Sequence, residues 1–217
     1  KSVLRQMTRD YCANCPLDEA RLEHPKMLPT GAEKPLVYIL GEAPGEEEDL
    51  VGEQFVGKAG KTLRNKIPSR WEKKIRWNNI IRCRPTSGNS NREPAPIEVA
   101  CCRRLQEEDI SRTKPKAVFG FGNVPLEWMI GEPGIQQWRG RRIPCTIRGH
   151  SFWFYPMLHP SYINRIRNDK KKGEEWERVF IQDLNWALGE LEEGLEEPYV
   201  EDAKKDLLKG IIPIMSW

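Results

Sequence analysis

Short apolar runs alternate along the chain with longer segments in which apolar residues recur every three or four positions. We expect a β-strand in each short run, and these runs cover 36–40, 80–83, 117–121, 143–147 and 152–158. We expect a helix in each longer segment, and these segments cover 59–67, 96–110, 124–130 and 174–191. The alternation of the two patterns predicts an α/β fold with a mainly parallel central sheet.

The length and composition narrow the class of protein. A chain of 217 residues is long enough for one sizeable core, so we expect one domain over 1–191 and a C-terminal extension over 192–217. Hydrophobic residues make up 38% and charged residues 31%, which is typical of a globular chain. The sequence has neither a bilayer-length apolar run nor an apolar stretch at its start. We therefore expect a cytoplasmic monomer with no membrane partner.

Basic residues gather locally although the net charge is only +3. One cluster follows a Gly-rich loop, one precedes a predicted strand, and one follows the only His-Pro-Ser sequence. Their members are Lys58, Lys61, Arg64 and Lys66, then Arg139, Arg141 and Arg142, then Arg165, Arg167 and 170–172. Each cluster alone is explained by a solvated charged face, so charge by itself does not establish nucleic-acid binding.

Two polar loops are expected at the same edge of the sheet. The loop 41–45 follows the first predicted strand, and His159 follows the last one. Because open α/β sheets place their binding sites beyond the carboxyl ends of the strands, these loops are the candidate site.

The six cysteines indicate metal or cluster ligation, because disulfides are rare inside cells. Cys12 and Cys15 are separated by two residues, and Cys83 and Cys102 form a distant second pair. Four thiolates suit either zinc or an iron–sulfur cluster, and geometry alone does not choose between them. The wide spacing of the second pair favours a cluster.

Cys101 and Cys102 are neighbours on a predicted helix and point about 100° apart, so at most one is a natural ligand. We choose Cys102. Cys101 and Cys145 are better interpreted as small buried hydrophobic residues.

Four groups of residues in this order resemble family 4 uracil-DNA glycosylases. The first is GEAPGEEED at 41–49, continued by Gly52 and by FVGKAG at 55–60, and another is HPSY at 159–162 with Arg165. Between them lie Asn79, followed by CRP at 83–85, and ACCR at 100–103. The resemblance covers about 12–188, and its strength comes from the four groups occurring together.

The resemblance implies a three-layer α/β/α fold and a DNA glycosylase that flips uracil out of DNA and hydrolyses its N-glycosidic bond in base excision repair. It implies a 4Fe-4S cluster with a structural role, held by Cys12, Cys15, Cys83 and Cys102. The implied partner is DNA that contains uracil or another modified base, either single- or double-stranded.

The resemblance also assigns roles in the base pocket. Phe55 stacks on the base, Asn79 reads its edge, and Gly41 and Ala43 line the pocket. An amide suits uracil because it donates to O4 and accepts from N3–H at the same time. The simpler interpretations are a core ring for Phe55 and a turn or cap for Asn79, where Asn78 leaves the register open by one residue.

Two residues are assigned to the chemistry. Cleavage leaves negative charge on uracil and positive charge on the sugar, so electrostatic stabilisation is the main requirement. His159 is expected to donate to uracil O2, and Glu42 to orient or activate the attacking water. Capping or ion pairing is the simpler role for Glu42. The acidic run 46–49 is interpreted as surface charge, and His24 and His150 as surface or strand-end residues.

The contacts to the DNA outside the pocket are expected from other motif residues. Ser161 hydrogen-bonds a phosphate, Arg165 and Lys61 steady the backbone, and Ile163 with Asn164 wedges into the vacated base stack.

The sequence departs from the family at Gln54, where proline is frequent, and we expect this to change only the stiffness of the loop. The polar loop 86–93 lacks the histidine of a related branch that becomes trapped on DNA, so ordinary turnover is expected. Three alternatives stay open. These are excision of a different modified base in repair or anti-phage defence, a non-catalytic cluster-containing DNA-binding module, and a replication-associated docking protein.

Overall fold

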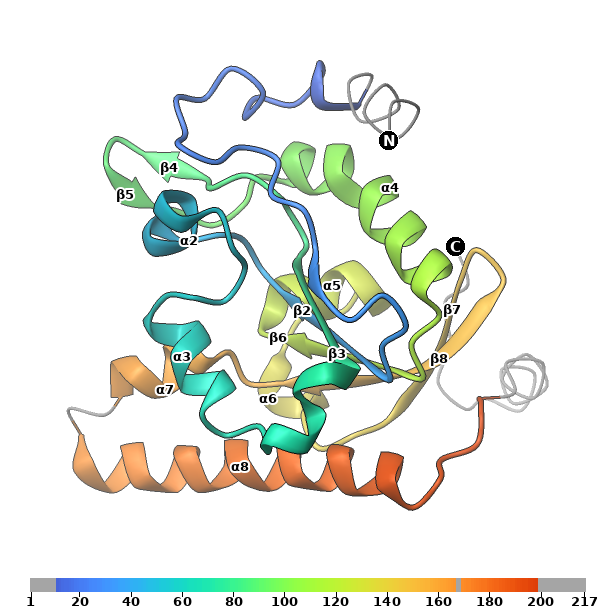
Figure 1. The fold of residues 1–217 in the computed structure, drawn as a ribbon. Helices are drawn as coiled ribbons and strands as arrows, with labels where there is room; N and C mark the ends of the chain where they lie inside the picture. The colour runs from blue at the N-terminus through green and yellow to red at the C-terminus, as the bar shows by residue number, and fades with distance from the viewer. Residues whose placement is uncertain (1–10, 167–168, 199–217) are drawn as a thin grey trace.

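The computed structural model describes residues 11–166 and 169–198, and in these residues the chain builds a six-stranded sheet. The strand order is β1-β3-β2-β6-β8-β7 (Figure 1). The four inner strands run parallel, and β1 and β7 are antiparallel edges. In the order of the chain, the strands are β1 Thr30–Gly31, β2 Val37–Gly41, β3 Ile75–Asn79, β6 Ala117–Phe121, β7 Ile143–Ile147 and β8 His150–Met157.

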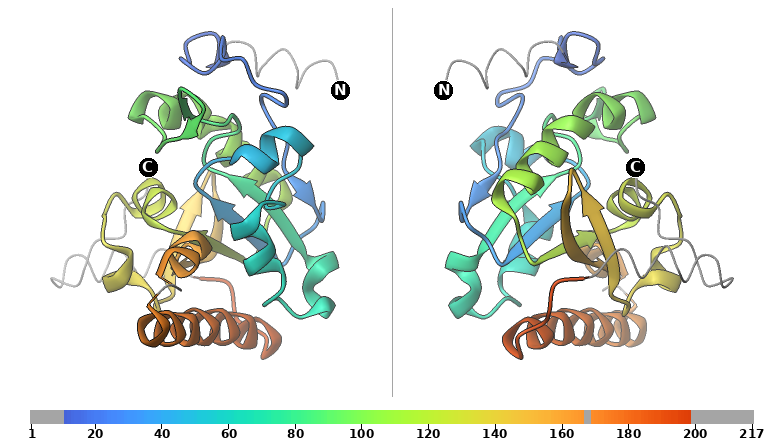
Figure 2. Two further views of the ribbon diagram at one scale, coloured as in Figure 1. Left: turned by 90° about the vertical axis from the view of Figure 1, so that its left-hand side faces the viewer. Right: turned by 90° about the vertical axis from the view of Figure 1, so that its right-hand side faces the viewer.

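Helices cover both faces of the sheet, so the expected three-layer α/β/α architecture with a mainly parallel sheet is confirmed (Figures 1 and 2). One face packs against α3 Lys58–Arg64, the 3-10 helix η1 Ser69–Lys74, α7 Pro160–Ile166 and α8 Lys170–Glu192. The other face packs against α4 Pro96–Thr113 and α5 Asn123–Ile130. The remaining elements are α2 Glu46–Val51, α6 Ile135–Trp138 and a hairpin of β4 Thr86–Ser87 and β5 Ser90–Asn91.

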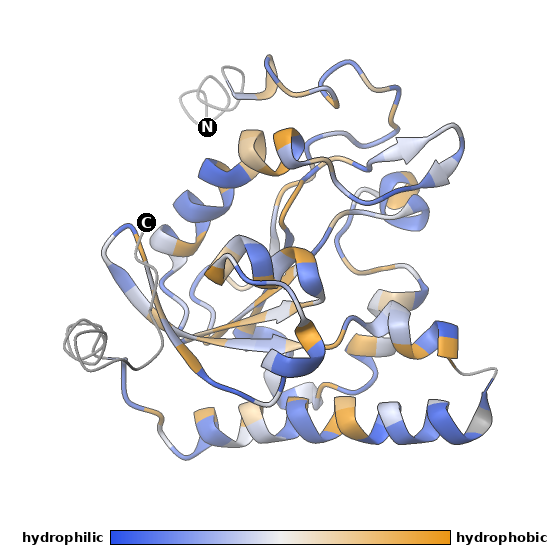
Figure 3. Cartoon of the chain, turned by 180° about the vertical axis from the view of Figure 1, so that it is seen from behind, coloured by the Kyte–Doolittle hydropathy of each residue, from blue (hydrophilic) through white to orange (hydrophobic). Residues whose placement is uncertain are grey.

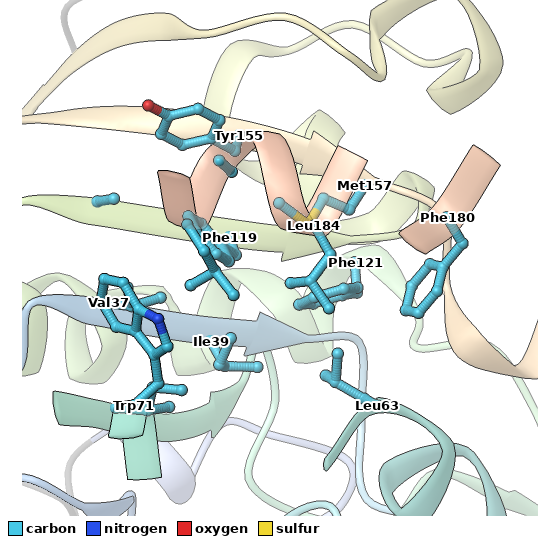
Figure 4. Close-up of a cluster of buried hydrophobic side chains, with 14 of the residues drawn as sticks. Val37, Ile39, Leu63, Trp71, Phe119, Phe121, Tyr155, Met157, Phe180 and Leu184 are labelled. Atoms are coloured by element: carbon cyan, nitrogen blue, oxygen red, sulfur yellow. The ribbon is translucent and has the colours of Figure 1, made fainter. Parts of the chain in front are cut away.

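The two cores follow from the alternation of side chains along each buried strand. In β2, Val37 and Ile39 belong to the core on the α8 side, whereas Tyr38 and Leu40 belong to the core on the α4 side. Every residue of β2 and β6 is buried, which is why both strands read as continuous apolar runs. Figure 4 shows the core on the α8 side, where Phe121 of β6 lies beside Phe180.

Helix α8 is the amphipathic helix expected from the sequence, extended at its start to the capping residue Asp169. The Asp169 carboxylate accepts a hydrogen bond from the backbone of Lys172 at 3.2 Å. Leu184 and Leu188 are buried against the sheet, while the opposite face of the helix is hydrophilic (Figure 3). The domain boundary expected at 191/192 lies at the end of α8, but 199–217 fall outside the described residues.

The strand expected at 80–83 was placed too late in the sequence, because the strand is β3 and ends at Asn79. Polar residues in β3 interrupt the apolar pattern by which a buried strand is predicted. Arg76 is buried and donates to Asp109 at 2.7 Å, and Asn78 donates to the Tyr38 hydroxyl at 2.8 Å. These partners lie far away along the chain, so the sequence pattern did not show that the polar residues of β3 are satisfied inside the protein.

Several short elements were not expected, among them the helices α2 and α7 and the hairpin β4–β5 in the polar segment 86–93. Each has fewer than two turns or only two residues per strand, which is too short for a recognisable period. Among the described helices, none combines the length and apolar character that crossing a bilayer requires.

Candidate active site

The loops that follow β2, β3 and β8 meet at one edge of the sheet because these strands are parallel. Gly41 at the end of β2 pairs in register with Asn79 at the end of β3. Gly122 follows β6, and a Cβ on it would lie 3.3 Å from the Cβ of His159, which follows β8. The expected site residues are therefore brought together by the carboxyl ends of adjacent strands.

Phe55 reaches the edge of the sheet from the segment between α2 and α3. A Cβ on Gly41 would lie 2.7 Å from Phe55 Cζ, so the absence of a side chain at Gly41 lets the ring approach the strand end. The ring is also part of the core, because its centroid lies 5.3 Å from that of Trp77. Phe55 thus combines the expected site position with the simpler role of a core residue.

The backbone of Phe55 is held in a left-handed conformation with φ of 58°, which is unfavourable for a bulky residue. Gly60 allows this, since a Cβ there would lie 2.1 Å from the Phe55 carbonyl oxygen. Arg64 donates to the same oxygen at 3.0 Å, and its guanidinium lies 4.0 Å from the Trp77 ring centroid. The position of the ring is therefore fixed by packing and hydrogen bonds, and not by the backbone conformation that a phenylalanine prefers.

Asn79 rather than Asn78 faces the site. Adjacent side chains of a strand point to opposite faces, and Asn78 pairs with Tyr38 and Gln106 on the α4 side. The Oδ1 atom of Asn79 lies next to Gly41, where a Cβ would be 2.2 Å away. The Nδ2 atom of Asn79 donates to Oε1 of Gln54. The open register is thus resolved in favour of Asn79.

Gln54 is fully buried, so the expectation that it changes only loop stiffness was wrong. Sequence reasoning missed it because a polar residue in a loop is usually exposed. The only signal was its departure from the proline that is frequent in the family.

His159 is a neutral imidazole whose Nδ1 is an acceptor. The backbone N–H of Ser161 donates to Nδ1 at 3.2 Å, and the Ser161 hydroxyl oxygen lies 2.7 Å from the same atom. Arg165 in turn donates to the Ser161 hydroxyl oxygen at 3.2 Å. Burial and the positive charge of Arg165 lower the pKa of His159 to about 4. The ring proton therefore resides on Nε2, which is free to donate.

Glu42 follows Gly41 directly and is half-buried. Its backbone oxygen accepts from the N–H of Ile81 at 3.2 Å, which ties the loop to the segment after β3. Burial and the nearby negative charge of Glu93 raise the pKa of Glu42, and the positive charge of Arg165 opposes this. The positive charge of Arg165 thus acts on both Glu42 and His159.

Two of the four acidic residues of α2, Glu48 and Asp49, shape the loop, whereas Glu46 and Glu47 are exposed. Glu48 accepts from the N–H of Gly45 at 3.1 Å and from the N–H of Gly57 at 2.8 Å. Asp49 is buried and accepts from the backbone N–H of His24 at 3.1 Å. Glu48 and Asp49 therefore have structural partners, which corrects the expectation of surface charge for these two residues.

A basic surface adjoins the site along α3 and α7. A hollow there is lined by Glu47, Lys58, Lys61, Thr62, Asn65 and Lys66. Lys61 is exposed and pairs with Glu47 at 3.0 Å, and Thr62 donates to Asn164 at 3.2 Å. Ile163, by contrast, is fully buried in the core on the α8 side. The expected wedge into the base stack is thus corrected for Ile163, because its side chain packs into the core on the α8 side.

The four expected ligand cysteines lie close enough to influence one another's pKa values. Cys12, Cys83 and Cys102 are buried and Cys15 is half-buried, and all of them are free thiols. The N–H of Lys26 donates to the Cys83 sulfur at 3.2 Å, and backbone N–H groups of Leu17 and Arg82 act on Cys15 and Cys102. Backbone donors of this kind stabilise thiolates that bind metal.

Within residues 11–166 and 169–198, no three His, Cys, Asp or Glu side chains converge tightly enough to hold a single metal ion. Burial raises the pKa of Cys83 to about 11 and of Cys102 to about 12, and a bound metal would deprotonate them. Cys145 is buried as expected, whereas Cys101 is half-buried beside Cys15.

Comparison with known proteins agrees with this geometry. The model of the uracil DNA glycosylase superfamily matches residues 28–185. A type-4 uracil-DNA glycosylase of Thermotoga maritima is 29% identical over 188 residues, which cover 81% of this chain and 87% of that protein. The enzymes of the same name from Saccharolobus solfataricus and Archaeoglobus fulgidus are similar as well. The Saccharolobus solfataricus enzyme is 29% identical, over 60% of this chain and 63% of its own length. The Archaeoglobus fulgidus enzyme is 31% identical, over 55% of this chain and 58% of its own length.

Proposed function

Because the chain belongs to the uracil-DNA glycosylase superfamily, we propose that it removes uracil from DNA by hydrolysing the N-glycosidic bond, as in base excision repair. One observation supports the proposal most strongly: four side chains of suitable chemistry lie at the carboxyl ends of the strands of one sheet. They are Asn79, Phe55, Glu42 and a neutral His159. A base reader, a stacking ring, a carboxylate and a proton donor are what this reaction needs.

Binding begins with a base that is flipped out of the DNA, because the sugar–base bond is not accessible inside a stacked helix. The flipped base stacks beside Phe55 and presents its O4 and N3–H edge to Asn79. The Nδ2 of Asn79 donates to O4 and Oδ1 accepts from N3–H. Cytosine reverses both polarities at this edge and leaves buried groups unpaired, which disfavours its binding.

His159 stabilises the leaving group. As the bond between C1′ and N1 breaks, negative charge develops on uracil O2 and N1. The Nε2–H of His159 donates to O2, and Ser161 holds the ring in the required tautomer. A neutral imidazole is sufficient for this role. Its N–H donates a hydrogen bond to the negative charge that develops on uracil, and the proton stays on the ring.

Glu42 acts on the other reactant. Its carboxylate orients a water molecule toward C1′ and accepts the proton that the water loses as the new C1′–O bond forms. The raised pKa of Glu42 makes it a stronger base than an exposed glutamate. The same negative charge offsets the positive charge that builds up on the sugar.

Cys12, Cys15, Cys83 and Cys102 are proposed to hold a 4Fe-4S cluster. A cluster bound there would cross-link the N-terminal segment, the segment after β3 and helix α4. The backbone donors to the sulfurs support this assignment, and the sulfur set lies outside the base site. No step of the hydrolysis involves the cluster.

The DNA backbone is proposed to follow the basic surface of α3 and α7. Lys61 and the exposed Arg165 supply positive charge there, and Asn164 and Ser161 supply polar groups for phosphate oxygens. Because Ser161 also holds His159, a phosphate contact at this hydroxyl would couple backbone binding to the orientation of the catalytic ring.

The test is release of uracil from a labelled oligonucleotide, run beside hypoxanthine and other modified bases in single and double strands. Asn79→Ala and His159→Ala should each lower kcat/KM by about 100-fold or more. Asn185→Ala and His150→Ala are matched controls on α8 and at the start of β8, and they should act like the wild type. Equal activity of all five proteins would refute the assigned pocket. Selective release of a different base would keep the glycosylase but change its substrate, and release of no base would favour a non-catalytic DNA-binding module.

A further inference from the structure

Gln54 is a buried polar side chain inside the site that the reaction described above does not use. It is 0% exposed and precedes Phe55 in the strained segment between α2 and α3. Arg64 donates to the Gln54 backbone oxygen at 3.0 Å, which fixes the residue's position. The side-chain Oε1 accepts from Nδ2 of Asn79. Gln54 is therefore locked onto the residue that reads the base.

The other end of the Gln54 amide is unsatisfied. Within the described residues, Nε2 is buried and has no hydrogen-bond partner. A buried N–H group without an acceptor is destabilising, so native proteins usually provide one from protein, water or ligand. The amide is attached to Asn79, whose Oδ1 faces Gly41 at the pocket. An acceptor atom on the bound base is thus the natural partner.

The geometry points to Gln54 as a second base-reading residue, which donates from Nε2 to the O4 oxygen of the flipped base while its Oε1 fixes the amide of Asn79. The inference rests on the proposed function. A carbonyl oxygen has two acceptor positions, so O4 can accept from both Gln54 and Asn79. Asn79 Nδ2 has two hydrogens, of which one is held by Gln54 and the other remains for the base.

This arrangement sharpens the choice between uracil and cytosine. Cytosine carries an amino group in place of O4, so its hydrogens would face two N–H donors instead of one. Gln54 also prevents the Asn79 amide from rotating into the orientation that would suit cytosine, since rotation would place Oδ1 against Oε1. The substrate class is therefore a base with a carbonyl oxygen beside a ring N–H.

The test compares two substitutions of similar size. Gln54→Met removes both the donor and the acceptor, whereas Gln54→Glu keeps an acceptor for Asn79 and removes the donor. The control is Gln182→Met on the exposed face of α8. Three quantities are measured: kcat/KM on uracil DNA, inhibition by free uracil against free cytosine, and the Gln54 side-chain amide resonance of the wild type during titration with uracil.

We expect kcat/KM on uracil DNA to fall by about tenfold in each Gln54 variant, which is the loss of one hydrogen bond. The preference for uracil over cytosine as inhibitor should narrow by a similar factor in Gln54→Met. Gln182→Met should keep the wild-type kcat/KM and the wild-type preference. The wild-type amide resonance should shift on addition of uracil. That last measurement does not depend on whether a variant folds.

Unchanged uracil activity and preference in Gln54→Met would overturn the inference. So would faster excision, because it would show that Gln54 blocks the pocket, and so would an amide resonance that ignores uracil. If the wild type releases no uracil, the proposed function fails, and the amide titration still decides separately whether Gln54 contacts the base.

Discussion

At the scale of single residues, the position of the His159 ring proton, which we propose to act in catalysis, is set by its neighbours. Nδ1 receives the backbone N–H and lies against the hydroxyl of Ser161, so only Nε2 can carry the proton of a neutral ring. Arg165 supports the hydroxyl from the other side. Three residues from one sequence motif thereby form a relay that sets the tautomer, which the motif alone does not reveal.

Ser161→Ala should lower the rate of uracil excision by about tenfold with a small change in KM, because one of the two groups that hold Nδ1 is lost. Single-turnover kinetics on a uracil oligonucleotide measures this. Ser151→Ala, which removes a hydroxyl paired with Thr146 at 3.0 Å on the distant edge hairpin, is the matched control and should be neutral. An equal effect of both substitutions would argue against the relay.

The pH dependence follows from two groups with opposite shifts. Glu42 must be deprotonated to act as a base, and its pKa is raised, so activity falls as the pH drops through that value. His159 gains a proton only near pH 4, because its pKa is lowered to about 4. We therefore expect kcat/KM to be independent of pH around neutrality and to fall at acid pH. Glu42 becomes protonated first, and His159 gains its proton at a still lower pH.

Arg165→Ala should move this acid limb to higher pH. Removing the positive charge raises the pKa of both Glu42 and His159, since Arg165 lowers each of them at present. A pH profile of kcat/KM for the variant and the wild type measures the shift. Arg178→Ala, on the exposed side of α8, controls for loss of a positive charge and should leave the limb in place. A limb that moves to lower pH in Arg165→Ala would contradict the assignment.

At the scale of elements, the segment between α2 and α3 is the part of the site that is held most tightly. Glu48 of α2 accepts from the N–H of Gly57 at the end of this segment, and also from the N–H of Gly45 just before α2. Arg64 binds the carbonyls of Gln54 and Phe55 in its middle. The strain at Phe55 is thus compensated by neighbours from both flanking helices, which hold in place the ring that we propose to stack on the base.

Gly60→Ala should destabilise the protein by about 1–3 kcal/mol and weaken uracil binding, because the new Cβ would lie 2.1 Å from the Phe55 carbonyl oxygen. Chemical denaturation gives the first quantity and KM the second. Gly189→Ala in α8 is the matched control, since a Cβ there meets nothing within 4 Å and should be neutral or stabilising. If Gly60→Ala changes neither the stability nor KM, the conformation of Phe55 does not depend on the close approach of Gly60.

At the scale of the whole molecule, the four expected ligand cysteines come from three parts of the chain that pack together on the α4 side of the sheet. Cys12 and Cys15 lie in the N-terminal segment, Cys83 follows β3, and Cys102 lies in α4. Lys26 adds a backbone hydrogen bond to Cys83 at 3.2 Å. A metal group at this point would fasten the N-terminal segment over the α4 side of the sheet, opposite the core that supports Phe55.

Cys102→Ser should lower the bound iron and the melting temperature, because a buried ligand is lost. Iron analysis and an absorbance shoulder near about 400 nm measure the cluster, and thermal unfolding measures stability. Cys145→Ser, in β7 and away from the other thiols, should keep its iron. A wild type that binds zinc and lacks the absorbance shoulder would contradict the cluster.

The sequence by itself determined the α/β class, most of the sheet and the long helices, because buried parallel strands and amphipathic helices have local apolar periods. It also determined which residue types stand at the strand ends, since the loops 41–45 and 159–161 follow directly from strands. The family resemblance then supplied roles for Glu42, Phe55, Asn79 and His159, and the strand ends bring these residues together.

Only the tertiary structure decided what depends on contacts between distant segments. It showed that β3 contains buried polar residues paired with α4 and β2, that Ile163 belongs to the core, and that Gln54 joins Asn79 inside the site. Burial and hydrogen-bond satisfaction are properties of the folded neighbourhood, and a polar residue has the same letter in the sequence whether its partner is water or an amide 25 residues away.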